Sequence, residues 1–128
     1  MAKYLLDTTV LIDHLRGQSQ VIDLLTALAG GGHQLGVCCI NVAELYAGLS
    51  PRDHARANRL IDSLDFYDVS REAAKQAGRF RFDFARRGVT LTVADGLIAA
   101  TATQEGATLI TANIRDFPME ELQLLQQP

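Results

Sequence analysis

A carboxylate closes the first apolar run of this chain, Tyr4-Leu5-Leu6-Asp7. Three later apolar runs, residues 35–40, 89–94 and 107–111, are each followed closely by another acid: Glu44, Asp95 and Asp116. Because the carboxyl ends of parallel strands in an open α/β sheet line one crevice, we expect these four side chains to converge. Clustered carboxylates repel one another unless a proton or a cation neutralises them. Oxygen-only ligand sets suit Mg²⁺ or Mn²⁺, so the pattern predicts a divalent-metal site.

Helix capping is the alternative explanation for each acid. Glu44 follows Asn41 by three residues and Asp95 follows Thr92 by three, which is the spacing of a capping box at a helix start. Asp116 could cap a segment that begins near Pro118. Capping explains Asp7 less well, because Thr8 or Thr9 could serve as the cap of the next helix in its place.

The order of the predicted elements indicates the fold class. Alternating strands and helices predict one α/β domain over residues 1–128, with a mostly parallel sheet of four or five strands and helices on both faces. We expect strands at residues 3–7, 35–40, 66–69 and 107–111, and a short edge strand at 122–125 before a polar tail. Helices are expected at 10–15, 21–30, 41–49 and 51–64, between Ser70 and Gly88, and from Thr92 through residue 103.

The charge of the chain is unevenly distributed. The formal net charge of −3 argues against a general nucleic-acid binder, which is usually basic. The segment from residue 71 to 87 is nevertheless basic, since two acids, Glu72 and Asp83, accompany Arg71, Lys75, Arg79, Arg81, Arg86 and Arg87. An acidic pocket beside a basic helix fits an enzyme that holds a metal and a phosphate backbone, whereas a simple solvated helix face is the alternative.

The remaining composition limits the class of protein. Cys38 and Cys39 are adjacent, too close for an ordinary disulfide, so we expect two buried free thiols. No apolar run approaches the ~20 residues of a membrane span, and the N-terminus lacks the pattern of a signal peptide, which predicts a cytoplasmic protein.

Phe82 lies outside the apolar stripe of the basic helix. A large exposed aromatic side chain marks a contact surface, so we expect Phe82 at a homodimer or partner interface.

Four segments together resemble the motifs of PIN-domain ribonucleases. They are residues 4–12 (YLLDTTVLI), 41–45 (NVAEL), 94–100 (ADGLIAA) and 111–117 (TANIRDF). Their order and the chain length are similar to those of VapC toxins of VapBC toxin–antitoxin pairs. One departure is Gly96, where the family often has alanine, at a cost of ~1 kcal/mol of helix stability.

The resemblance implies an α/β/α sandwich in which Asp7, Glu44, Asp95 and Asp116 surround Mg²⁺ or Mn²⁺, supported by Thr9 and Asn113. It also implies an endoribonuclease that uses metal-activated water, with an RNA substrate, a VapB-type antitoxin and a homodimer as partners. Arg79, Arg86 and Arg87 could then guide the RNA, although the last two could instead stabilise the end of their helix.

Three other functions share some of these features. A receiver domain needs a lysine after a late strand, and the chain has only Lys3 and Lys75. A small metal-dependent phosphatase would use the same acids on small esters. A PIN-like RNA-binding module without catalysis is the third alternative, which the complete set of acids disfavours.

Overall fold

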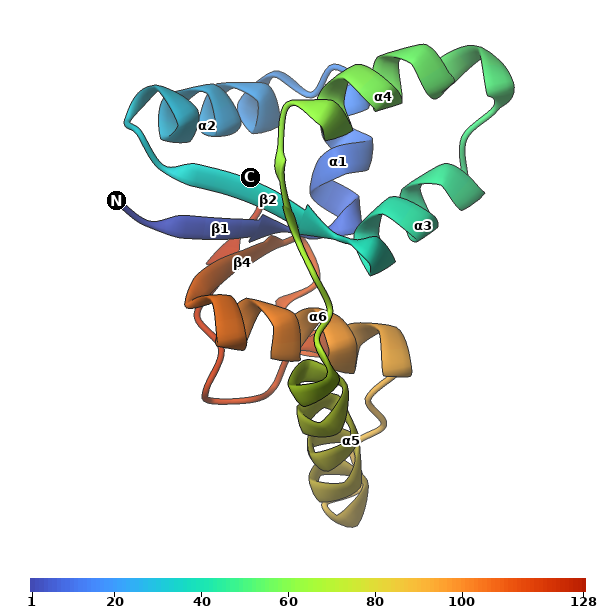
Figure 1. The fold of residues 1–128 in the computed structure, drawn as a ribbon, viewed down its shortest axis with the longest axis vertical. Helices are drawn as coiled ribbons and strands as arrows, with labels where there is room; N and C mark the ends of the chain where they lie inside the picture. The colour runs from blue at the N-terminus through green and yellow to red at the C-terminus, as the bar shows by residue number, and fades with distance from the viewer.

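One sheet of five parallel strands forms the centre of the molecule (Figure 1). The computed structural model describes residues 1–128. The strands are β1 (Lys3–Leu6), β2 (Gln34–Cys38), β3 (Asp65–Tyr67), β4 (Ala107–Thr111) and β5 (Leu124–Gln126), in the spatial order β3-β2-β1-β4-β5. The chain moves outward from β1 to β3 and then returns to place β4 on the other side of β1. The position between β1 and β4 is therefore the topological switch point, where open α/β sheets bind ligands.

Helices cover both faces of the sheet, so the predicted α/β/α class is confirmed (Figure 1). One face carries α1 (Thr8–Leu15), α2 (Ser19–Gly30), α3 (Cys39–Ala47) and α4 (His54–Asp62), and the other carries α5 (Arg71–Arg86) and α6 (Val93–Glu105). Two 3₁₀ turns, η1 (Pro51–Asp53) and η2 (Ile114–Asp116), complete the structure. None of the helices has the length and apolarity needed to span a bilayer.

Neighbouring residues on each central strand supply the two cores. Leu5 packs in the cluster under α5 and α6, and Leu6 packs in the cluster under α1 to α4. Leu109 and Ile110 divide in the same way on β4. Successive side chains of a strand point to opposite faces, so an almost uninterrupted apolar run is what a sheet buried on both faces requires.

The basic helix α5 packs through the stripe expected from its sequence. Ser70 caps it by accepting a hydrogen bond of 3.0 Å from the Ala73 amide, and Ala73, Ala77, Phe80 and Phe84 are buried. The other side of α5 is solvated, and the helix extends away from the sheet beyond α6 (Figure 1). The basic residues of this helix consequently lie on the surface.

Several predicted boundaries are wrong by one to two residues. β2 ends at Cys38 and α3 begins at Cys39, so only Cys38 is a buried thiol and Cys39 is exposed. Asn41 is not the helix cap: its side-chain oxygen accepts a hydrogen bond of 3.0 Å from the amide of Cys38, which is the cap. α1 begins at Thr8, earlier than expected, and β5 lies later than the predicted edge strand.

Candidate active site at the carboxyl ends of β1 and β4

Asp7 joins the two strands that flank the switch point. Its amide donates to the Ile110 carbonyl at 3.0 Å, and one carboxylate oxygen accepts 2.6 Å from the Thr111 hydroxyl. The other oxygen accepts 2.9 Å from the Thr8 amide, so Asp7 itself is the cap of α1 and the expectation that Thr8 or Thr9 takes this place is wrong. The side chain is held rigidly because it is buried and bonded at both oxygens.

The environment of Asp7 disfavours its negative charge. Burial raises the pKa of this carboxyl above its usual 3.8, and the charges of Glu44 and Asp116 raise the pKa further. The hydrogen bonds from Thr111 and Thr8 act in the opposite direction. A group held in this way gains from a cation that offsets its charge.

Asp95 occupies the first turn of α6. The Thr92 hydroxyl caps this helix by accepting 3.1 Å from the Asp95 amide, which confirms the Thr92 cap. Burial raises the pKa of the Asp95 carboxyl, the interaction with Thr92 opposes this, and the charges of Asp116, Asp7 and Glu44 add to the increase. The capping geometry and the position near the other acids therefore coexist: Thr92 binds the backbone amide of Asp95, and the carboxylate remains close enough to the other three acids for their charges to raise its pKa.

Glu44 and Asp116 complete the acidic group from opposite sides. Glu44 lies well inside α3, so the alternative that it forms a capping box with Asn41 is wrong. Its carboxylate accepts a hydrogen bond of 2.7 Å from the Thr8 hydroxyl. Asp116 is exposed in η2 and borders an open hollow of about 430 Å³ together with residues 112–115 and Gln126. Both side chains remain accessible to solvent.

No cation of the protein neutralises these acids. The ion pairs of the structure join Lys3 to Glu105, Arg56 to Asp53 and Lys75 to Glu72, and none includes the four carboxylates. The acids influence one another's pKa, yet no three His, Cys, Asp or Glu side chains approach closely enough to enclose an ion by themselves. The site is an open group of negative charges.

Two threonine hydroxyls, those of Thr8 and Thr111, bond directly to the acids. Thr9, expected beside the metal, donates 2.9 Å to the Gln127 side chain, and Asn113, the other expected supporting residue, donates from its backbone amide to the Thr111 hydroxyl at 3.0 Å. Thr8 and Thr111 are the residues that bond to Glu44 and Asp7. Thr8 could have been identified from the sequence because it directly follows Asp7. Thr111 is distant in sequence, and only the register of β4 against β1 shows that it lies beside Asp7.

The arginines proposed to contact RNA lie on α5 and at its end, on the solvated side. Arg86 stacks at 5.3 Å from the Phe82 ring, and Arg87 lies 4.3 Å from the Phe84 ring. Arg79 is exposed, and all three lack an acidic partner. Phe82 itself is 62% exposed, as its place on the helix predicts.

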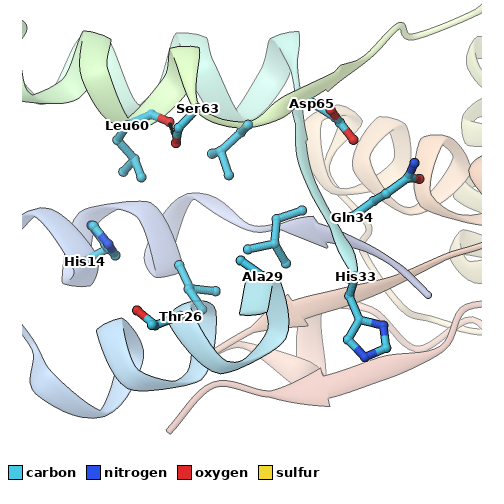
Figure 2. A pocket seen from close by; sticks show the side chains of 11 residues that line it. His14, Thr26, Ala29, His33, Gln34, Leu60, Ser63 and Asp65 are labelled. Atoms are coloured by element: carbon cyan, nitrogen blue, oxygen red, sulfur yellow. Dashed lines mark hydrogen bonds between the residues drawn. The ribbon is translucent and has the colours of Figure 1, made fainter. Parts of the chain in front are cut away.

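A separate hollow of about 530 Å³ lies between α2, α4 and β2, away from the acids (Figure 2). Thr26 and Ala29 of α2 and Leu60 of α4 face each other across it. His14 and His33 also border this hollow. The third histidine, His54, packs against the Tyr46 ring at 5.5 Å, and none of the three is among the groups that shift the pKa of Asp7 or Asp95.

Comparison with known proteins agrees with this geometry. The family model described as PIN domain matches residues 4–118. The chain is 34% identical over 117 residues to "Ribonuclease VapC19" of Mycobacterium tuberculosis, covering 90% of this chain and 92% of that protein. It is 29% identical over 122 residues to "tRNA(fMet)-specific endonuclease VapC" of Salmonella typhimurium, covering 91% of each.

Among solved structures, VapBC2 from Rickettsia felis, bound to a DNA fragment from its promoter, superposes with a TM-score of 0.89 at 24% identity. That match covers 98% of this chain and 99% of the other, and it shows a common fold. The four acids lie within the matched region, in the order and positions that the sequence motifs indicate. The chain therefore belongs to the PIN-domain family, within its group of VapC ribonucleases.

Proposed function

We propose that this protein is a metal-dependent endoribonuclease that acts as the toxin of a toxin–antitoxin pair. The observation that carries the proposal is the group formed by Asp7, Glu44, Asp95 and Asp116 at the switch point, with no cationic partner from the protein. Uncompensated carboxylates in this position are suited to a divalent cation, and the relatives named as ribonucleases favour RNA as the substrate class. RNA and antitoxin would both be met in the cytoplasm.

The carboxylate ligands fit Mg²⁺ or Mn²⁺, although no three of them lie close enough together to coordinate one ion directly. Mg²⁺ retains several waters and is commonly bound by one or two carboxylates directly. Asp7 and Asp95 are the best candidates for direct ligands, because burial and neighbouring charge raise the pKa of each. Glu44 and Asp116 add negative charge nearby. A bound ion would activate water for attack on a phosphodiester and offset charge on the leaving oxygen.

The chain's own residues orient this site and attract the substrate. The Thr111 and Thr8 hydroxyls fix the rotamers of Asp7 and Glu44, so less side-chain freedom is lost on binding. Arg79, Arg86 and Arg87 present unpaired positive charge on the solvated side of α5 and just beyond it. Such charges raise the local concentration of RNA, although they do not select a sequence.

Incubation of the purified protein with RNA tests this function directly. We expect cleavage in Mg²⁺ or Mn²⁺ and none after chelation. Parallel incubation with p-nitrophenyl phosphate tests the phosphatase alternative, and a binding measurement on the same RNA tests the non-catalytic module. Hydrolysis of the small ester without RNA cleavage, or metal-independent RNA binding without cleavage, would contradict the proposal.

The same acids suggest how an antitoxin would inhibit the enzyme. The VapBC structures with this fold contain a partner chain beside the toxin. An arginine of such a partner could pair with Asp7 or Asp95 through two hydrogen bonds, in the place that a metal would occupy. Antitoxin and metal would then compete for the site.

Titration of the toxin with its antitoxin at increasing Mg²⁺ measures this competition. We expect the affinity to fall as Mg²⁺ rises, and Asp95→Asn to weaken binding in metal-free buffer. Binding that responds to neither change would mean that inhibition occurs elsewhere, for example at the basic helix or in the hollow of Figure 2.

A further inference from the structure

Gln127, which follows β5, is buried and forms hydrogen bonds through its backbone amide and both polar atoms of its side chain. Gln127 is 6% exposed, whereas glutamine is mostly exposed in folded proteins. Its amide donates 2.9 Å to the Thr111 carbonyl, and its side-chain oxygen accepts 2.9 Å from the Thr9 hydroxyl. Its side-chain nitrogen donates 2.5 Å to the Asp13 carboxylate. The expected polar tail is therefore part of the folded structure.

These contacts connect the elements that carry the acidic site. Thr9 and Asp13 lie on α1, the helix that Asp7 caps, and Thr111 ends β4. Thr111 uses its hydroxyl to hold Asp7 and its carbonyl to hold Gln127. The Thr9 hydroxyl also accepts 3.4 Å from the Ala112 amide. Gln127 thus forms a second link between α1 and β4, beside the direct link from Asp7 to Thr111.

The chemistry of the link makes it sensitive to charge. A hydrogen bond to an ionised carboxylate is stronger than a neutral one, and a buried amide without partners is unfavourable. Asp13 forms no ion pair, and the Gln127 amide donates the one hydrogen bond to its carboxylate. Replacing the amide by a second carboxylate would place two anions in contact and force α1 and the terminus apart.

We propose that Gln127 is a positioning residue for the acidic site. By holding α1 against the end of β4, it keeps Asp7 in place, and it keeps Thr8 where its hydroxyl meets Glu44. The role rests on the proposed ribonuclease function, but its consequences include metal binding, which can be measured separately. A terminal segment that only closes the fold would contribute to stability and leave the bound metal and the chemistry unchanged.

A charge exchange between two side chains provides the test. In Gln127→Glu, the new carboxylate faces Asp13; in the double variant with Asp13→Asn, the donor and the acceptor change places and the bond can form again. Gln123→Glu is the matched control, because Gln123 is exposed and its side chain bonds only to Thr108, away from the acids. Each protein is measured well below its own melting temperature, for RNA cleavage with Mn²⁺ and for Mn²⁺ affinity by calorimetry.

We expect Gln127→Glu to lose about tenfold or more in cleavage, because small misplacements of reacting groups have effects of this size. Mn²⁺ affinity should fall with it, both should recover in the double variant, and Gln123→Glu should match wild type. Thr9→Val removes the hydroxyl that donates to Gln127 and accepts from Ala112, leaves the bond between Gln127 and Asp13, and should show a smaller loss of both cleavage and Mn²⁺ affinity. This variant decides the matter if Gln127→Glu does not fold.

A lower melting temperature with unchanged cleavage and unchanged Mn²⁺ affinity would overturn the positioning role. If the wild-type protein binds Mn²⁺ but cuts no RNA, the proposed function fails, and the Mn²⁺ affinities of the variants decide the positioning role alone. If the wild-type protein neither binds Mn²⁺ nor cuts RNA, both proposals fail.

Discussion

Asp7 combines a structural role with an electrostatic cost. It caps α1 and accepts the Thr111 hydroxyl, yet burial and two neighbouring acids raise its pKa. Because its pKa is higher in the folded state, this carboxyl binds its proton more tightly there than in the unfolded state. The resulting stabilisation is complete below the unfolded-state pKa and is lost as pH rises through the folded-state pKa. Asp7→Asn would relieve that loss, but one of the two donors to this side chain, the Thr111 hydroxyl or the Thr8 amide, would then face an amide nitrogen in place of an acceptor. The net gain in stability for this variant should be small.

Asp95→Asn is the cleaner test of repulsion among the acids. Its cap bond uses the backbone amide and remains, while the group whose pKa is raised by burial and by three neighbouring acids loses its charge. We expect a melting temperature a few degrees above wild type at pH 7 in chelator, and no difference below the usual pKa of 3.8, where both side chains are neutral. Thermal unfolding across this pH range measures it, and a lower melting temperature at pH 7 would instead indicate a net stabilising carboxylate.

At the level of elements, apolar periodicity predicted most of the fold and failed where side chains set the boundaries. The two faces of β1 and β4 follow from their uninterrupted apolar runs. The end of β2 does not, because Cys38 and Asn41 bond to each other locally and begin α3 inside an apolar stretch. The burial of Gln127 could not be predicted either, since it depends on α1 and β4, which are distant in sequence. The proximity of the four acids was predicted from the apolar runs that precede them, whereas the Thr111 contact required the register of β4 against β1.

Two glycines on these elements should respond oppositely to alanine. At Gly96 of α6 a methyl group would lie 3.4 Å from Ala77, an ordinary contact, so Gly96→Ala should stabilise the protein by up to ~1 kcal/mol through helix propensity. At Gly36 of β2 the same group would lie 2.5 Å from the Tyr67 ring, so Gly36→Ala should destabilise by about 1–3 kcal/mol. Chemical denaturation gives both values. Destabilisation at Gly96 would show that α5 and α6 cannot accommodate the added methyl.

At the scale of the whole molecule, negative charge lies at the switch point and positive charge on α5 and at its end. Phe82 is 62% exposed among these arginines, and Phe66 on the edge strand β3 is 54% exposed. Of these two rings, only that of Phe82 is stacked by an arginine, Arg86, and aromatic residues together with arginine are enriched at protein interfaces. We expect Phe82→Ser to weaken a homodimer or the antitoxin complex and Phe66→Ser to serve as its matched control. Light scattering and antitoxin titration measure both, and normal assembly of Phe82→Ser in the two assays would refute the contact surface.

The most direct test of the account is metal-dependent RNA cleavage by Asp7→Asn, compared with wild type and Asp62→Asn. Asp62 is exposed at the end of α4 and has no ion pair, so its variant controls for the loss of one charge. With folding verified by circular dichroism, we predict that Asp7→Asn loses Mg²⁺- and Mn²⁺-dependent cleavage while Asp62→Asn retains it. Wild-type cleavage by folded Asp7→Asn would contradict the assignment of the active site to the carboxyl ends of β1 and β4.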